Sequence, residues 1–455
     1  MPETFNLGSY RPTVLQLGES SKNSVIASFD EFEMFTGLTE IPGNASSYSS
    51  GSFINCSSLS SILIPNTVKK IGGAAFAYCS ALNIDLDFPS VEEIGKIAFT
   101  NSGIKSIVNL GKVESLEGLN SNIIGSWRNY GVFSECSNLT SAILPTTLKV
   151  IGDYCFMQCP NLTIVVFLDR NSITTIKQFV FYNTPISSDV DFPYLETIGY
   201  ASYYNTAITS VKNLGKITTL GRISGGTDSG VEGWQYYGTF RSCKNLTSVN
   251  LPTETIKEVG QGSFANCTAL EQINLASCSV LQMVCEQAFY NCGLMAVDIS
   301  TLNNLKKIAG LSFYKCADLT GELNAPSLES IGDRAFARSG LKRVSNLGTI
   351  TTFPLNTSAN DGVWGLGVFG YCTQLELARI PDTVTTLPRY LFYGCTALAT
   401  IIMDASTPPT IESSTFGNTN DIFIIYVPNS SLNAYKAATN WSAYASRIKP
   451  ISELS

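Results

Sequence analysis

The chain has 455 residues, of which 44% are hydrophobic and 14% are charged, and this balance argues against a disordered protein. Its 29 basic and 36 acidic side chains give a net charge of −7, which argues against nucleic acid or an anionic membrane as a partner. The complete absence of histidine excludes Ser-His-Asp and Cys-His nucleophile systems and histidine metal sites.

The first residues of the chain match no internal pattern. Residues 1–31 are therefore predicted to be an N-terminal cap or a leader segment. Residues 1–29 lack the charged start and apolar run of a signal peptide, and no stretch of the chain is apolar for long enough to span a membrane. We expect no direct membrane insertion. Either an export signal was removed, or the protein is not exported by that route.

A repeat fills residues 32–418, and its clearest copy is FRSCKNLTSVNLP, from Phe240 to Pro252. The frame is Phe, then Cys three residues on, Leu six on, a β-branched residue nine on, an aliphatic eleven on and Pro twelve on. Further well-formed copies begin at Phe53, Phe133 and Phe369. Looser copies have their aromatic anchor at Phe32, Phe76, Phe99, Phe156, Phe181, Tyr203, Phe264, Phe289, Phe313, Phe336, Phe392 and Phe416. About sixteen units, mostly ~21 to 25 residues apart, predict a solenoid.

One unit has a direct physical interpretation. Val249 and Leu251 alternate with polar Asn250, which predicts a short strand with one face inward. Pro252 ends that strand, because proline cannot donate to a strand ladder. An aliphatic-glycine pair such as Ile71-Gly72 precedes most anchors, where the glycine is predicted to supply a tight turn and the anchor to fill the interior. Stacked coils, with strands about 4.8 Å apart, would merge these side chains into one core.

The run F-x-x-C-x-x-L-x-x-I-x-L-P with its I-G-x-x-A-F return resembles the BspA-like leucine-rich repeat family of cell-surface proteins. The resemblance covers residues 32 to the C-terminus. It implies a right-handed solenoid of short-strand coils with irregular or 3-10 turns, capped at both ends. It also implies display outside the cell and binding of host matrix proteins, glycans or other cells. The family has no shared catalytic residues to carry over.

Most of the 13 cysteines stand at the third step of the repeat. They are Cys56, Cys79, Cys136, Cys159, Cys243, Cys267, Cys292, Cys316, Cys372 and Cys395. Because looser units place Phe35, Ser102 or Thr184 there, we interpret the step as a packing position and its cysteine as a small buried apolar group. Cys278 and Cys285 have no such place, and a local pair between them stays open.

Three units carry the same insertion, which begins near Ser102, Thr206 and Ser339 and ends at a well-formed unit. Three of the 4 tryptophans lie in these insertions. The predicted ligand-binding residues are the aromatics of the insertions and of one related position: Tyr48, Trp127, Tyr130, Trp234, Tyr236, Tyr237 and Trp364. They either staple each insertion onto the coil beneath or form stacking platforms for a sugar or a protein.

Two other motifs are weighed and set aside. The acidic pairs in DLDFP (Asp85, Asp87) and DVDFP (Asp189, Asp191) are placed by strand alternation on an outer face, where they are interpreted as solvated rather than as calcium ligands. The string GLGVFG at 365–370 lacks a surrounding βαβ unit, so it is not interpreted as a dinucleotide site. We predict no metal and no cofactor.

After Phe416 the repeat stops, and residues 419–455 are predicted to be a C-terminal cap. Residues 422–427 form an apolar strand in this prediction, followed by a helix that includes Leu432 and Tyr435. The whole pattern predicts a monomeric extracellular or cell-surface adhesion protein that recognises a host matrix protein, a glycan or a cell-surface receptor. The alternatives are a phage or prophage receptor-binding fibre component and, less favoured, a carbohydrate-active enzyme; we predict no enzymatic activity.

Overall fold

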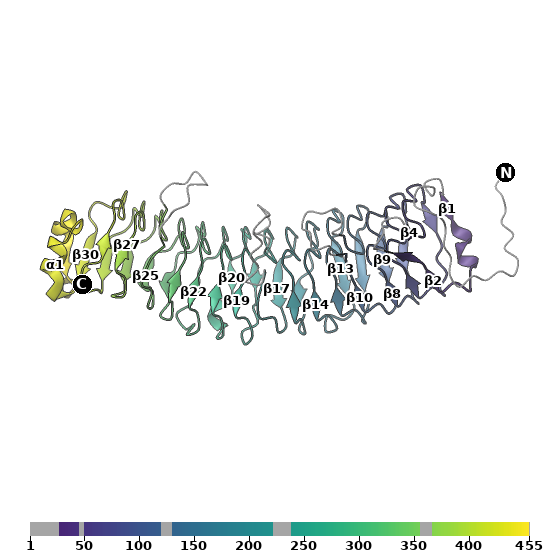
Figure 1. Ribbon diagram of the computed structural model, residues 1–455, viewed down its shortest axis with the longest axis horizontal. Coiled ribbons are helices and arrows are strands. Elements are labelled where there is room, and N and C mark those ends of the chain that lie inside the picture. Colours follow the sequence, from purple (N-terminus) through teal and green to yellow (C-terminus); the bar gives the residue numbers. More distant parts are fainter. Residues whose placement is uncertain (1–26, 45–49, 120–129, 222–237, 355–365, 455) are drawn as a thin grey trace. The chain divides into compact units, whose positions relative to one another are not determined.

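The computed structural model describes residues 27–44, 50–119, 130–221, 238–354 and 366–454. This part of the chain is a parallel β-solenoid of about 15 turns with little helix (Figure 1). The chain divides into two compact units, Met1–Ile208 and Thr209–Ser455. The predicted stack of short-strand coils is therefore confirmed.

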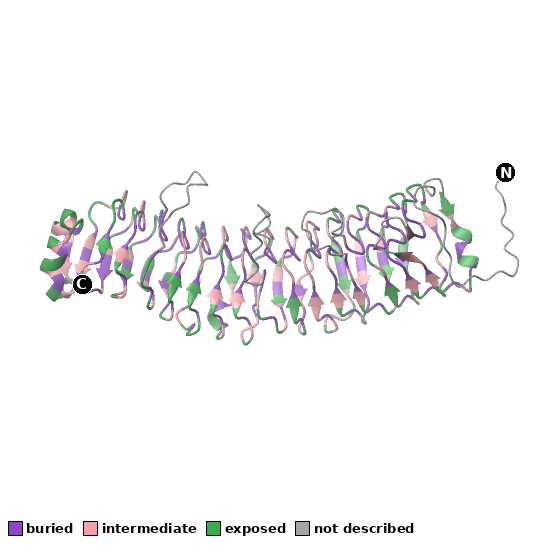
Figure 2. Ribbon diagram, in the orientation of Figure 1, coloured by how far each residue is buried: buried purple, intermediate pink, exposed green. Residues whose placement is uncertain are grey.

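The strand that follows the leucine of each coil belongs to what we call the first strand row. In the first unit the row contains β1 (Ser28–Phe29) paired with β5 (Ser61–Ile62), then a sheet of β7 (Asp85–Asp87), β9 (Ser106–Asn109), β11 (Ser141–Leu144) and β13 (Ile164–Phe167), and then β15 (Val190–Asp191). In the second unit it contains β17 (Ser210–Asn213), β18 (Ser248–Val249) and β20 (Gln272–Ile273), followed by a sheet of β23 (Glu322–Asn324), β25 (Arg343–Asn346), β26 (Leu377–Ile380), β28 (Thr400–Met403), β30 (Ile424–Val427) and β31 (Ile448–Pro450). Buried residues alternate with less buried ones along many of these strands (Figure 2). In β7, Leu86 is buried while Asp85 and Asp87 are exposed.

A second strand row, which the sequence pattern did not reveal, ends at the aliphatic residue before the glycine. In the first unit it contains β2 (Glu40–Ile41), β6 (Lys70–Ile71), β8 (Glu93–Ile94), β10 (Ser115–Leu116), β12 (Val150–Ile151), β14 (Thr175–Ile176) and β16 (Thr197–Ile198). In the second unit it contains β19 (Glu258–Val259), β21 (Met283–Val284), β22 (Lys307–Ile308), β24 (Ser330–Ile331), β27 (Thr386–Leu387) and β29 (Thr410–Ile411). Most coils in the described part of the chain thus contain two short strands rather than one.

The glycine that follows this row has a different role from the predicted one. A Cβ on Gly72 would collide with the backbone of Pro42 and Gly43 in the preceding coil, and a Cβ on Gly95 would collide with Gly73. Neither glycine has the positive φ of a left-handed turn. A turn does begin at each glycine, because the carbonyls of Gly72 and Gly95 accept from the amides of Ala75 and Ala98 at 3.3 and 3.2 Å. Glycine itself is required there because neighbouring coils approach closely.

The anchors form the predicted core. Phe53, Phe76 and Phe99 are fully buried, and their rings stack 5.0 and 5.2 Å apart with interplanar angles of 6° and 8°. The second unit repeats this ladder, with Phe264 lying 5.5 Å from both Phe240 and Phe289. Each ring therefore has an aromatic neighbour on both sides, which is the arrangement that excludes water from a solenoid core.

All 13 cysteines are buried and free, so the packing interpretation is confirmed and Cys278 and Cys285 do not pair. The structure adds a polar contact to this position. The Sγ of Cys79 donates to the carbonyl of Phe53 at 3.0 Å, and the Oγ1 of Thr184 donates to the carbonyl of Phe156 at 2.6 Å. Cysteine and threonine interchange because both are small side chains with a donor.

Short irregular elements complete the two units. The 3-10 helix η1 (Asp30–Met34) carries Phe32, whose ring meets Phe53 edge-on at 87° instead of stacking on it. An antiparallel pair, β3 (Gly43–Asn44) and β4 (Ser50–Gly51), follows, and η3 (Leu275–Ser277) lies in the second unit. The end of the second unit holds η4 (Asn429–Ser431), α1 (Leu432–Ala437), η5 (Trp441–Arg447) and η6 (Ile451–Glu453). Phe416 lies 5.5 Å from Tyr444 and 6.5 Å from Trp441, so this segment covers the last ring of the ladder.

Candidate functional site

Most of the predicted site residues lie outside the described residues. These are Tyr48, Trp127, Trp234, Tyr236, Tyr237 and Trp364. Tyr130 is described and half-buried, and its backbone carbonyl accepts a 2.8 Å hydrogen bond from the amide of Leu119. The ligand-binding role of the set stays a prediction.

Tyr130 connects the base of the first insertion to the coils beneath it. Its side chain packs against a buried apolar cluster of Ile54, Ala74, Ala77 and Ile97 and forms a hydrogen bond with Tyr78. Burial raises the pKa of Tyr78, and the charge of Glu135 adds to this, whereas the bond to Tyr130 lowers it. At this one position the contacts fit the stapling interpretation.

The edge of the coil around each anchor has an unusual backbone. Phe179 and Asn183, two residues before and two after Phe181, have φ of 54° and 54°. The anchor's amide donates to the carbonyl of Ser202 at 2.7 Å, and that of Asn183 donates to Tyr204 at 2.9 Å, so bonds to the next coil hold this conformation. We call the residues from two before to two after each anchor the turn edge. Left-handed φ favours asparagine among residues other than glycine.

On the first unit, aromatic side chains gather on this turn edge. Tyr154 stacks on Phe179 with ring centroids 5.1 Å apart, and Tyr182 stacks on Tyr204 at 4.7 Å. Tyr200, one residue before the turn edge of Tyr203, meets Phe179 edge-on at 5.2 Å. Tyr182, Tyr200 and Tyr204 are half-buried, so part of each ring faces solvent.

The turn edge of the second unit combines rings with cations. Lys315 Nζ lies 5.9 and 5.5 Å from the ring centroids of Tyr290 and Tyr314, which stack on each other at 5.3 Å. Further along, Arg338 lies over Tyr371 at 5.4 Å, and Tyr371 meets Tyr393 at 5.6 Å. Each cation is attracted by the negative face of its ring.

Asparagines accompany the rings and supply amide groups. The Nδ2 of Asn205 donates to the Oδ1 of Asn183 at 2.9 Å, and the Nδ2 of Asn418 donates to the hydroxyl of Tyr393 at 2.6 Å. An aromatic face next to amides can stack on the apolar face of a sugar and bond its hydroxyls, and half-exposed tyrosines also suit a protein interface. The turn edge therefore has the chemistry of a binding surface.

The sequence also contains a pattern that indicates this surface and that does not involve the insertions. Tyrosine follows the anchor directly in several units, namely Phe181-Tyr182, Tyr203-Tyr204, Phe289-Tyr290, Phe313-Tyr314 and Phe392-Tyr393. Any single pair is unremarkable. The recurrence at one step of the repeat would have predicted an aromatic row, because equivalent positions of stacked coils are neighbours.

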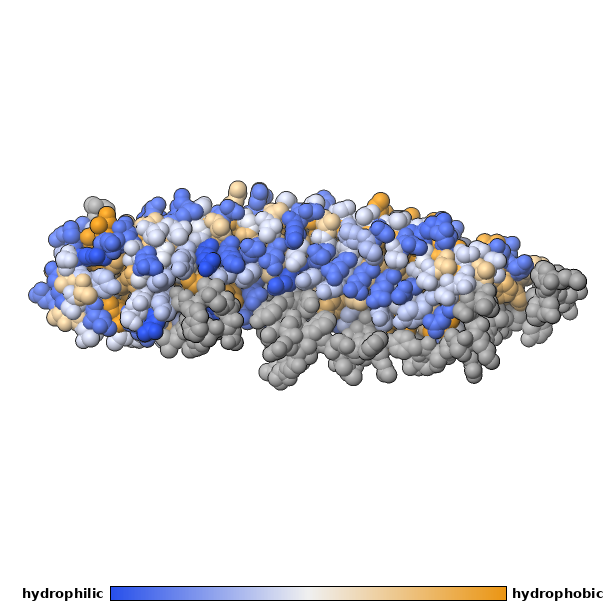
Figure 3. Space-filling view, turned by 90° about the horizontal axis from the view of Figure 1, so that it is seen from above, coloured by the Kyte–Doolittle hydropathy of each residue, from blue (hydrophilic) through white to orange (hydrophobic). Residues whose placement is uncertain are grey.

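Charged side chains next to the second strand row pair with one another instead. Lys69 lies 3.1 Å from Glu92, and Lys149 lies 2.8 Å from Glu114, in each case between neighbouring coils. These pairs are exposed, so each stabilises the fold by about 0 to 1 kcal/mol. On the face shown in Figure 3, hydrophilic residues are interspersed with small apolar patches.

Among the described residues, no group of three or more Cys, Asp or Glu is arranged to hold a metal ion. No helix in the described part of the chain has the length and apolarity needed to cross a membrane.

Comparison with known proteins places the repeat in a family. A family model described as “BspA type Leucine rich repeat region”, in 6 copies, matches residues 26–122, 128–224, 236–361 and 365–448. A search of curated proteins found no match.

Three solved structures are similar to the chain. A leucine-rich repeat protein from Bacteroides ovatus is 23% identical, with 78% of this chain and 83% of that chain covered and a TM-score of 0.48. A leucine-rich cell surface protein from Faecalibacterium prausnitzii is 19% identical, with 83% and 85% covered and a TM-score of 0.41. The pneumococcal vaccine antigen PcpA is 18% identical, with 91% and 83% covered and a TM-score of 0.42.

Proposed function

Because the chain belongs to the BspA-type leucine-rich repeat family, we propose that it is a repeat-based binding protein of the cell surface that adheres to a host protein, a glycan or another cell. The family is generally non-catalytic, and the proposal accordingly assigns binding rather than turnover. It places binding on the turn edge.

Aromatic rings on the turn edge, several of them half-exposed, support this assignment. Tyr182 and Tyr204 are half-buried and stack 4.7 Å apart in neighbouring coils. In the second unit the half-buried Tyr290 stacks at 5.3 Å on Tyr314, which is buried. A long glycan or an extended protein segment can contact several of them at once. Linked weak contacts then multiply into useful avidity without any single strong site.

We add the tryptophans of the insertions to the same proposal on the basis of their positions in the sequence. Trp127, Trp234 and Trp364 lie in segments that join the chain next to the turn edge, as Leu119 and Tyr130 do at the first insertion. We include them as additional platforms for the same extended ligand.

The test is capture of the full chain on an array of glycans and matrix proteins. The double variant Tyr182→Ala/Tyr204→Ala is expected to weaken capture by at least about tenfold, because stacking and avidity are lost together. Lys69→Ala, an exposed change directly before strand β6 of the second row, is the matched control and should leave capture unchanged. Equal capture by both variants and the wild type would refute the turn edge as the binding surface.

A further inference from the structure

The first unit contains the motif D-x-D-F-P twice, at 85–89 and 189–193. Both copies follow an interruption of the first strand row. β7 begins a new sheet after β5, and β15 lies outside the sheet whose edge strand is β13. We call these two places the first junction (β5 to β7) and the second junction (β13 to β15).

At the second junction an arginine of the chain occupies the interruption. The guanidinium of Arg170 donates to the carbonyl of Asp189 at 2.8 Å. It also lies 5.4 Å from the ring centroid of Phe167 and 5.6 Å from that of Phe192. The guanidinium thus contacts aromatic rings and donates a hydrogen bond to oxygen at the same time, a combination for which a guanidinium is better suited than an ammonium.

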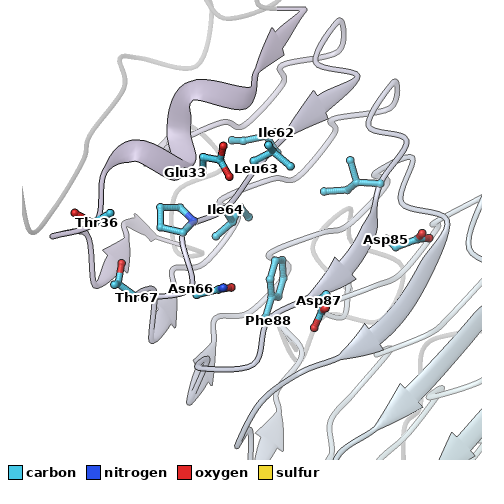
Figure 4. A pocket seen from close by; sticks show the side chains of 12 residues that line it. Glu33, Thr36, Ile62, Leu63, Ile64, Asn66, Thr67, Asp85, Asp87 and Phe88 are labelled. Carbon is cyan, nitrogen blue, oxygen red and sulfur yellow. The ribbon is translucent and has the colours of Figure 1, made fainter. Parts of the chain in front are cut away.

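The first junction lacks this side chain. The loop after β5 is shorter than the loop after β13, and its residues Pro65, Asn66 and Thr67 include no arginine. An open pocket of about 440 Å³ lies there instead (Figure 4). Asp85 and Asp87 are exposed, whereas the matching Asp189 and Asp191 are half-buried beside Arg170.

The lining of this pocket matches the surroundings of Arg170. Phe88 and Ile64 correspond to Phe192 and Phe167 and supply the apolar surface. The carbonyl of Ile84 accepts from the amide of Lys105 on the β9 side at 2.9 Å, so alternation turns the carbonyl of Asp85 toward the pocket.

The pocket at the first junction is also lined by negatively charged carboxyl groups. Glu33, Asp85 and Asp87 line the pocket, and no described lining residue is a lysine or an arginine. Figure 4 shows that they come from separate segments, η1 and β7. A single cation bound between them would be attracted by all three.

We propose that the pocket at the first junction binds the guanidinium of an arginine side chain on a protein partner, as the second junction holds Arg170. The inference rests on the proposed binding function and specifies one contact of it. The ring of Phe88 selects a planar cation, and the carboxylates of Asp85 and Asp87 select charge over a neutral isostere.

The first test uses blocked five-residue peptides with arginine, lysine or citrulline between pairs of glycines, titrated into the full chain by ligand-observed NMR. The arginine peptide is expected to bind at least about tenfold more tightly than the other two. Asp85→Asn/Asp87→Asn should weaken its binding by at least about tenfold. Equal binding of the citrulline peptide would overturn the proposal, because charge would then have no part in recognition.

Two substitutions test whether the junctions are equivalent, by adding an arginine at the first junction or removing the arginine from the second. Asn66→Arg should fill the first pocket from within and abolish peptide binding. Arg170→Ala should open a second pocket and raise the peptide stoichiometry from one to two. Failure of Arg170→Ala to create a site, in a variant whose thermal unfolding stays cooperative, would contradict the equivalence of the junctions.

The remaining outcomes identify other occupants or separate the two proposals. Arg11 belongs to the N-terminal segment, outside the described residues. If Arg11→Gln raises peptide affinity, this arginine of the chain itself is the occupant, and a protein partner is excluded. If no peptide binds the wild type while array capture persists, this inference fails and the proposed function stands. If the arginine peptide binds while array capture is lost only in the pocket variants, the turn edge fails instead.

Discussion

The anchors inside the coils and the neighbouring positions on the turn edge differ in how much their residues vary from coil to coil. Inside, the anchors hardly vary, and Phe133 and Phe156 stack 5.4 Å apart at an angle of 16°. One residue further along, the position after the anchor holds Ala77, Ser134 or Tyr182 in different coils. Because the coils stack, each interior residue contacts the equivalent residues of the coils next to it. A substitution there therefore disturbs the packing of neighbouring coils as well. On the turn edge the position after the anchor varies from the buried Ala77 and Ser134 to the half-exposed Tyr182, and where the side chain reaches solvent the variation leaves room for recognition.

Removing the C-terminal segment should have the largest effect on the interior. Without residues 419–455, Phe416 loses its contacts with Tyr444 and Trp441, and β28 loses its partner β30. An exposed core layer and strand edge favour aggregation, so we expect oligomers in size-exclusion chromatography. Removing only residues 451–455 should leave a monomer. Residues 419–455 as a cap stay a prediction, and a stable monomer without them would refute it.

Alkaline pH should have the second-largest effect, because it lowers the free energy of unfolding through the buried thiols. Burial raises the pKa of Cys136 from 9.0 to about 12 and that of Cys372 from 9.0 to about 11. Unfolded thiols ionise near 9 while these folded thiols stay neutral, so the stability that they contribute is complete below pH 9 and is lost between about pH 9 and 12. Each such thiol should lower the free energy of unfolding by up to about 1.4 kcal/mol per pH unit.

The measurement is the melting temperature between pH 7.5 and 11. Cys316→Thr, which follows the exchange seen at Thr184, removes one thiol and should make the decline shallower. A melting temperature that is constant to pH 11 would contradict protected thiols.

A single anchor should contribute several kcal/mol to the free energy of unfolding. Phe264 is fully buried between Phe240 and Phe289, and Phe264→Ala should lower the free energy of unfolding by about 3 to 5 kcal/mol. Chemical denaturation measures this value. Phe264→Leu keeps most of the volume and is the control. A loss below about 1 kcal/mol for the alanine variant would show that the ladder collapses around the cavity.

The insertion tryptophans should have the smallest effect on stability. Trp127→Ala, Trp234→Ala and Trp364→Ala are each expected to change the free energy of unfolding by less than about 1 kcal/mol, as for exposed platforms, and to weaken ligand capture. Trp441 is the matched control, because it is fully buried and donates to the carbonyl of Pro409 at 2.6 Å. Its replacement by alanine should cost about 3 to 5 kcal/mol. Losses above about 2 kcal/mol in the insertions with unchanged capture would identify them as staples.

The repeat period, the buried anchors and the cysteine position could all be predicted from the chain alone. They depend on residues that recur at one step, and a stack turns recurrence along the chain into contact between coils. Phe264 is buried for the reason that Phe240 and Phe289 are buried. The strand through Val249 followed likewise from alternation over a few residues.

Other features depended on contacts between coils that no single coil encodes. The glycine at Gly72 is required by the backbone of Gly43 in the preceding coil, and the left-handed Phe179 is held by the carbonyl of Tyr200 in the next coil. The two D-x-D-F-P copies are identical in their repeated letters, yet one receives Arg170 and the other borders a pocket. Local pattern determined which residues face inward. Only the stacked structure decided which outward-facing residues meet, because their partners come from coils about 20 or more residues away in sequence.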